Sequence, residues 1–217
     1  MKTDAEIKRD VEAELKWSPE VDETDIAATV REGVVALSGY AKSYFEKYRA
    51  EAAVKRIAGV RAVANDLAVR APLGGTPPDP EIARNVVAAL RAELPLIWEN
   101  IKPLVHEGHV GLEGTVEWHY ERESAEAAVH RVPGVASVRN SIRLKPRVFV
   151  GEIKHKIEEA FRRNAIIDAQ GITVDAQGGE ITLRGEVRSW AEHDQAQQMA
   201  WAAPGVTQVK NELTIRT

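Results

Sequence analysis

Three histidines lie within a short stretch of this 217-residue chain and suggest a metal site, because imidazole is the commonest metal ligand in proteins. They are His106, His109 and His119. His106 and His109, however, flank a predicted turn between two strands and do not share a helix face. The chain has no cysteine, which excludes thiolate metal sites, disulfides and thiol nucleophiles. We therefore predict no metal site and no cofactor.

A second set of candidates is aromatic and gathers where a helix is predicted to begin: Tyr44, Phe45, Trp118, Tyr120 and Trp190. Tyrosine and tryptophan suit a membrane–water interface, because one end of the ring is apolar and the other is polar. They suit protein interfaces equally well. A structural role, in which the rings hold each helix to its own or a neighbouring domain, explains the same residues.

The third set is basic and follows a helical pattern beside Ile153, Ile157 and Phe161: Lys154, Lys156, Arg162 and Arg163. A basic amphipathic helix can lie on a surface of anionic lipid headgroups. Acidic neighbours such as Glu158 and Glu159 dilute this charge, so an ordinary solvated helix face is the alternative.

Catalysis and nucleic-acid binding find no support in the sequence. It contains no nucleophile elbow, P-loop, HExxH motif or dinucleotide fingerprint, so we predict that the protein is not an enzyme. A net charge of -4 argues against a general nucleic-acid binder. No apolar run approaches the roughly 20 residues of a membrane-spanning helix. The beginning of the chain lacks a secretory apolar segment, which predicts a cytoplasmic protein, or a periplasmic one if an export signal was removed.

The chain repeats itself three times without a gap within each copy. A Leu-x-Gly motif is followed 20 residues later by Gly-Val, and an Asn lies six residues beyond that glycine. The columns are Gly39, Gly114 and Gly185; Gly59, Gly134 and Gly205; and Asn65, Asn140 and Asn211. We predict domains at residues 1–71, 82–146 and 147–217, with a Gly/Pro-rich linker at 72–81. Because the second joint is short and apolar, copies 2 and 3 are expected to pack closely and copy 1 to be freer.

Each copy shows the order helix, strand, strand, helix, strand. In copy 1, Ile7, Val11 and Leu15 recur at helical spacing, and period-2 patterning then indicates a hairpin that ends at the glycine of Leu-x-Gly. A glycine there is expected where a strand bends, bulges or lets a backbone approach closely. The last strand follows a helical crossover and should be parallel to the second. The fold class is therefore α+β, with three tandem αββαβ domains, each a three-stranded mixed sheet with two helices on one face.

Two polar columns recur at the second helix and the last strand. The glutamates are Glu46, Glu121 and Glu192. Ser43 and Ser189 precede two of them by three residues, which is the pattern of a capping box, although a functional carboxylate remains the alternative. The asparagine column is expected to bond to local backbone, with a ligand contact as the alternative.

The spaced pattern of Leu-x-Gly followed by Gly-Val-x-x-Val-x-Asn resembles the BON domain, three times over nearly the whole chain. The resemblance implies a bacterial protein of a family that is usually exported, appears in stress and envelope maintenance, and binds phospholipid. It offers no catalytic motif.

Together these observations predict a non-enzymatic binding module that contacts phospholipid or another amphiphile through the aromatic and basic sets. The alternative is a cytosolic protein–protein interaction scaffold. The predicted partners are thus a phospholipid membrane surface or a protein, with self-association open and nucleic acid excluded.

Overall fold

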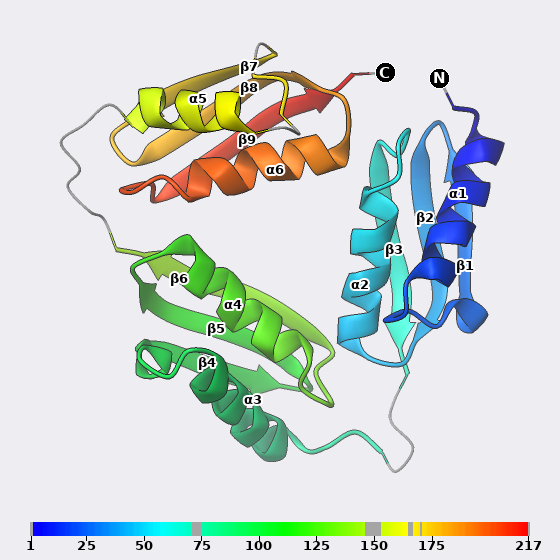
Figure 1. Cartoon of the computed structure of the whole chain (residues 1–217). Helices are drawn as coiled ribbons and strands as arrows, with labels where there is room; N and C mark the ends of the chain where they lie inside the picture. Colours follow the sequence, from blue (N-terminus) through cyan, green and yellow to red (C-terminus); the bar gives the residue numbers. More distant parts are fainter. Residues whose placement is uncertain (1, 71–74, 146–152, 165–166, 170, 217) are drawn as a thin grey trace.

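Each copy of the repeat forms its own three-stranded sheet in the computed structural model, which describes residues 2–70, 75–145, 153–164, 167–169 and 171–216 (Figure 1). Domain 1 contains α1 (Asp4–Trp17), β1 (Ile26–Arg31), β2 (Val34–Ala41), α2 (Tyr44–Lys55) and β3 (Ala62–Val69). Domain 2 contains α3 (Asp79–Glu93), β4 (Ile101–His106), β5 (His109–Val116), α4 (His119–His130) and β6 (Ser137–Leu144). Domain 3 contains α5 (Ile153–Arg163), β7 (Ile172–Gln177), β8 (Glu180–Val187), α6 (Trp190–Trp201) and β9 (Gln208–Ile215). Parts of both predicted joints, residues 71–74 and 146–152, lie outside the described residues.

The second strand of each domain is central in its sheet. β2 pairs antiparallel with β1 and parallel with β3, and the other two sheets repeat this order and register. The predicted α+β class, hairpin and parallel third strand are confirmed. No helix among the described residues is long and apolar enough to span a bilayer.

The first helix of each domain buries one apolar stripe against the sheet. In α1 the stripe is Ile7, Val11 and Leu15, each no more than 2% exposed. Full burial of such a side chain stabilises the fold by about 1.5–3 kcal/mol. Thr3 caps the start of the helix in a capping box, in which Glu6 accepts the Thr3 backbone N–H at 2.7 Å. In α5 the stripe is Ile153, Ile157 and Phe161, which belong to the core of domain 3.

The glycine of Leu-x-Gly permits a close backbone approach, as the sequence predicts. Gly39 has a φ of +114°, and a Cβ placed on it would lie 2.0 Å from the carbonyl oxygen of Asp25. The equivalents Gly114 and Gly185 would meet carbonyl oxygens at the same distance. Any side chain here would force the central strand away from the segment that leads into the first strand.

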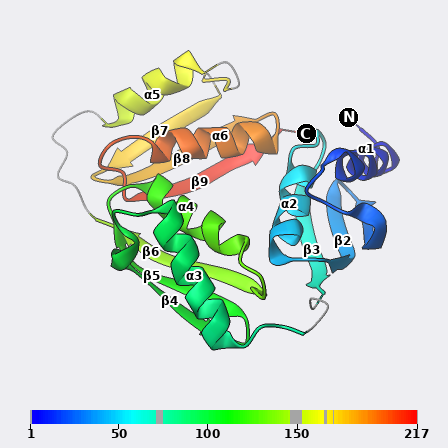
Figure 2. The same ribbon diagram turned by 60° about the horizontal axis from the view of Figure 1, so that its bottom comes forward.

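The three domains are arranged so that their second helices, α2, α4 and α6, face the middle of the molecule (Figures 1 and 2). Domain 1 packs against both others. The core of domain 2 contacts Tyr44, and the core of domain 1 contacts Trp190. Contrary to the expectation that copy 1 is freer than the others, domain 1 thus contacts both of them.

Candidate binding surface at the domain junctions

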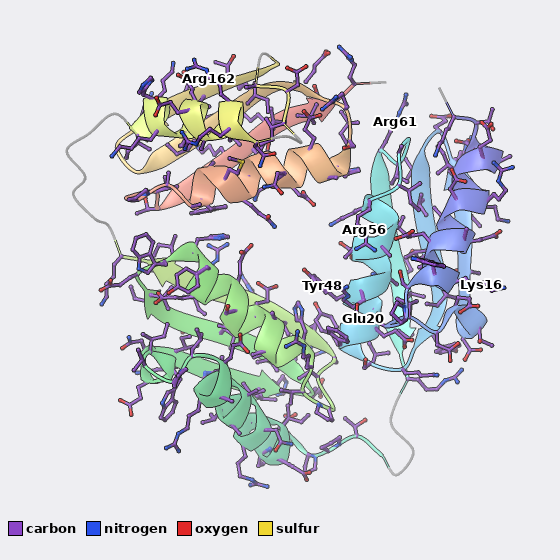
Figure 3. The ribbon with its side chains drawn as sticks, in the orientation of Figure 1. Lys16, Glu20, Tyr48, Arg56, Arg61 and Arg162 are labelled. Carbon is purple, nitrogen blue, oxygen red and sulfur yellow. The ribbon has the colours of Figure 1, made fainter. Side chains whose placement is uncertain are left out.

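The junction between domains 1 and 2 is built on the first residue of α2. The ring of Tyr44 meets the ring of His130, the last residue of α4, edge to face at a centroid distance of 5.1 Å. Tyr48, one turn along α2, reaches the same imidazole at 4.6 Å and points towards domain 2 (Figure 3). The guanidinium of Arg131 lies 5.6 Å from the centre of the Phe45 ring. Aromatic pairs of this geometry each contribute about 0.5–1.5 kcal/mol beyond the area they bury.

The junction between domains 2 and 3 repeats this relationship. His119, the first residue of α4, stacks on Trp201, the last residue of α6, at 4.0 Å and an interplanar angle of 14°. Arg122, one turn along α4, lies 5.5 Å from the centre of the Trp201 ring.

The junction between domains 3 and 1 uses the first residue of α6. The indole N–H of Trp190 donates a hydrogen bond of 3.1 Å to the carbonyl oxygen of Arg61, and the ring packs against the domain 1 core. In the repeat register Tyr44, His119 and Trp190 are equivalent residues. The contacts of Tyr44 and Trp190 with a neighbouring domain agree with the structural alternative, in which the rings hold each helix to a domain.

Trp118 and Tyr120 flank His119 in the sequence and line a pocket of about 550 Å³ beside it. Trp201 and Gln198 close the pocket from domain 3, and Glu123 contributes a carboxylate. The Tyr120 side chain is 61% exposed. The pocket thus combines aromatic surface with polar groups at a boundary between two domains.

The basic set lies elsewhere, on the outer face of domain 3, where Figure 3 shows Arg162 on the side turned away from the other domains. Lys154, Lys156, Arg162 and Arg163 are all exposed on α5. Lys154 lies 3.8 Å from Glu158, so part of the charge is offset within the helix. Because the apolar stripe of α5 is already in the core, this helix offers charge but no free apolar face. The structure does not bring the aromatic and basic sets together.

The glutamate column has a structural role that extends beyond a capping box. The carboxylate of Glu192 accepts the backbone N–H groups of Asp168 and Arg188, both at 2.7 Å, and is 1% exposed. Burial raises the pKa of Glu192, but these two N–H groups and the Arg188 guanidinium together outweigh burial, and the pKa lies below its usual value. Glu46 likewise bonds to the N–H groups of Asp22 and Lys42.

The predicted reciprocal bond of the capping box is therefore displaced. The serine half forms, since the Glu192 N–H donates to Ser189 Oγ at 3.2 Å and the Glu46 N–H donates to Ser43 Oγ at 3.1 Å. The carboxylates of Glu192 and Glu46, however, accept the backbone N–H of the residue before the serine and not that of the serine itself. Each carboxylate also accepts an N–H from the loop that precedes the first strand. Glu121 does bond to the N–H of Trp118, at 2.9 Å.

The asparagine column links the last strand to the second helix. Asn140 Nδ2 donates to the Arg122 carbonyl at 2.9 Å and to Glu126 at 3.0 Å, and its Oδ1 accepts the Ile142 N–H at 3.2 Å. Asn65 and Asn211 make equivalent bonds. The local backbone bond matches the expectation, and the link to the helix is additional.

His106 and His109 lie opposite each other in the β4–β5 pair, whereas the local contacts of His119 lie elsewhere. His109 Nδ1 lies 2.6 Å from Ser137 Oγ, whereas His119 is engaged with Trp201. Over the described ranges no group of three or more His, Asp or Glu side chains is placed to hold a metal ion.

Sequence reasoning missed His130 and Trp201, whose rings are contacted by Tyr44 and His119 at two of the junctions. A signal was present, because these residues occupy the same repeat column at the end of the second helix. His130 is 5% exposed, its ring is enclosed by those of Tyr44 and Tyr48, and its Nε2 lies 3.6 Å from the Glu126 carboxylate.

The BON domain matches this chain three times, at residues 3–71, 78–146 and 150–217. The chain therefore belongs to the BON domain family. Among characterised proteins it is 30% identical over 146 residues to osmotically-inducible protein Y of Escherichia coli K12, which covers 65% of this chain and 73% of that protein. Two solved structures of CdsD, a structural protein of the type III secretion system of Chlamydia trachomatis, are 14% identical with TM-scores of 0.25 and 0.26. They cover 96% of this chain, and 96% and 91% of their own.

Proposed function

We propose that this protein is a non-catalytic binding module of the osmotic-stress response that contacts an amphiphile, with phospholipid as the ligand class. The observation that carries the proposal is the pocket between domains 2 and 3, lined by Trp118, Tyr120 and Trp201. The sequence similarity of the chain to an osmotically inducible protein supports a role in the osmotic-stress response.

The chemistry of the pocket suits a ligand with an apolar part and a polar part. The rings of Trp118 and Tyr120 offer apolar surface, while Glu123, His119 and Gln198 supply hydrogen-bonding groups nearby. The basic face of α5 adds a separate, purely electrostatic contact to anionic headgroups. Such a contact weakens as salt shortens the Debye length, whereas apolar contact with the pocket does not.

The test is co-sedimentation with phosphatidylcholine vesicles and with vesicles that also contain phosphatidylglycerol, at low and physiological salt. Tyr120→Ala should weaken salt-resistant binding about tenfold, which corresponds to the lost burial of one aromatic ring. Tyr40→Ala is the matched control, because Tyr40 is 53% exposed on domain 1 and lies far from the pocket in sequence. Equal binding by both variants would contradict the pocket as the lipid site.

A protein-interaction scaffold is the second candidate, and a specific observation favours it. Trp17, Leu96 and Leu104 are 83%, 94% and 70% exposed, which suits contact with another protein. If no vesicle sediments the protein under any condition, the lipid proposal fails. Partner capture that is lost in Leu96→Ser and Leu104→Ser would then favour the scaffold.

A further inference from the structure

A cleft of about 450 Å³ lies between domains 1 and 3, beside the bond that joins Trp190 to Arg61. Lys2 and Arg61 line it from domain 1, and Arg188 and Arg216 line it from domain 3. Figure 3 shows Arg61 at the end of domain 1 that lies next to domain 3. Four cationic side chains, two from domain 1 and two from domain 3, thus line one cavity.

Only part of this charge is neutralised by neighbouring carboxylates. Lys2 pairs with Asp10 at 2.6 Å, and Arg188 lies 3.2 Å from Glu192. In the described part of the chain, neither Arg61 nor Arg216 has a carboxylate partner.

Two carboxylates also line the cleft, those of Asp4 and Glu32. Asp4 is already engaged, because its two oxygens accept the backbone N–H groups of Glu32 and Gly33 at 2.7 and 3.0 Å. Glu32 brings its carboxylate to the cleft as well, so the lining carries four cations and two carboxylates. Arg61 and Arg216, one from each domain, are the guanidinium groups that can meet an anion from solution.

The equivalent repeat positions at the other two junctions do not carry the same set of four cations. In the repeat register, Arg188 and Arg216 correspond to Lys42 and Arg70 of domain 1. Lys2 and Arg61 correspond to Pro77 and Ala136 of domain 2. Lys42 pairs with Asp22 and Arg70 pairs with Asp25, so both cations at these two positions have a carboxylate partner. Between domains 2 and 3 the equivalent positions hold Glu117, Lys145 and Thr207, which carry no net charge. The repeat alone therefore does not account for the four cations at the junction between domains 1 and 3.

We propose that the cleft binds a phosphate group, either free or as a lipid headgroup, and that the anion bridges Arg61 of domain 1 to Arg216 of domain 3. The planar guanidinium fork matches the oxygens of a phosphate in two parallel hydrogen bonds. Ile7 and Ile215 also line the cleft and can meet an apolar part of the same molecule. The bound anion adds a second link to the junction that Trp190 forms. This site is separate from the aromatic pocket; binding of a lipid headgroup here rests on the proposed function, whereas binding of free phosphate goes beyond it.

The test is isothermal titration of the full chain with inorganic phosphate and with glycerol phosphate, together with vesicles of phosphatidylglycerol. Arg61→Gln and Arg216→Gln should each weaken binding at least about tenfold, because each removes one charge-assisted fork. Arg143→Gln is the matched control, since Arg143 is exposed on domain 2 and does not line the cleft. Far-UV circular dichroism checks that each variant folds.

The arms of the experiment separate the two sources of phosphate. Titration by the soluble phosphates, lost in both cleft variants, supports a free phosphate ligand. Binding to phosphatidylglycerol vesicles alone, lost in the same variants, supports a lipid headgroup. Binding to neither, or binding that both cleft variants retain, overturns the proposal. Tyr120→Ala should leave phosphate titration unchanged, so failure at this cleft and failure at the aromatic pocket are distinguishable.

Discussion

The indole N–H of Trp190 and the carbonyl oxygen of Arg61 are joined by a hydrogen bond of 3.1 Å although 129 residues separate them in the chain. The contact places the start of α6 on domain 1, so the last domain is anchored to the first. In Trp190→Ala, domain 1 should separate from domain 3 while each domain keeps its own core. Small-angle scattering should then show a larger radius of gyration with an unchanged far-UV spectrum.

Trp17→Ala is the control for this measurement, because Trp17 is 83% exposed at the end of α1. Identical scattering from the wild type and from Trp190→Ala would show that the junction does not depend on this ring.

The second prediction concerns Glu192, whose carboxylate accepts two backbone N–H groups from separate segments. In Glu192→Gln one acceptor becomes an NH₂ donor that faces an N–H donor, which should cost about 1–3 kcal/mol at pH 7. The folded-state pKa of Glu192 lies below its ordinary value of 4.5. Its stabilisation is therefore fully present above pH 4.5 and is lost as the pH falls through the folded-state pKa.

The difference in unfolding free energy between the wild type and Glu192→Gln should accordingly narrow in urea titrations from pH 6 to pH 3. Glu186→Gln in the same domain alters an exposed side chain and should stay within about 0.5 kcal/mol of the wild type at both ends. A difference for Glu192→Gln that is constant across this range would contradict the assigned role.

The third prediction compares two glycines of domain 3 that both have positive φ. Gly185 has a φ of +130°, and a Cβ there would lie 2.0 Å from the carbonyl oxygen of Gly171. Gly178 has a φ of +61° with nothing within 4 Å of the same position. Gly178→Ala should cost about 1 kcal/mol from backbone conformation alone. Gly185→Ala adds a backbone clash and should lower the midpoint of thermal unfolding much further, and equal midpoints would exclude that close approach.

Much of each domain is predictable from local patterns, because the features that specify it lie close together in the chain. The alternation around Leu37 and the glycine after it predict a strand that cannot carry a side chain at Gly39. The helical crossover that follows predicts a third strand parallel to the second. These inferences use spacings of a few residues, at which propensity and periodicity are strong.

The missing parts depend on contacts between distant segments. Glu46 reaches the Asp22 N–H 24 residues earlier, and no local pattern reports where that loop returns. The pairing of Tyr44 with His130 depends on how two complete domains sit together, although the repeat columns mark both residues. Arg61 and Arg216 lie at one cleft because domains 1 and 3 are in contact. The composition of the linkers had instead predicted that domain 1 is freer than the others.

The order of the junctions has a further consequence for assembly. At every junction the start of the second helix of one domain contacts a part of the next domain other than the start of its own second helix. Each domain therefore uses two unlike surfaces, one towards each neighbour. Contacts between unlike surfaces either close into a ring or continue as an open filament. Here Trp190 returns to domain 1, and the ring closes after three domains within one polypeptide. The contacts that the starts of α2, α4 and α6 make with a neighbouring domain are thus all made within one polypeptide.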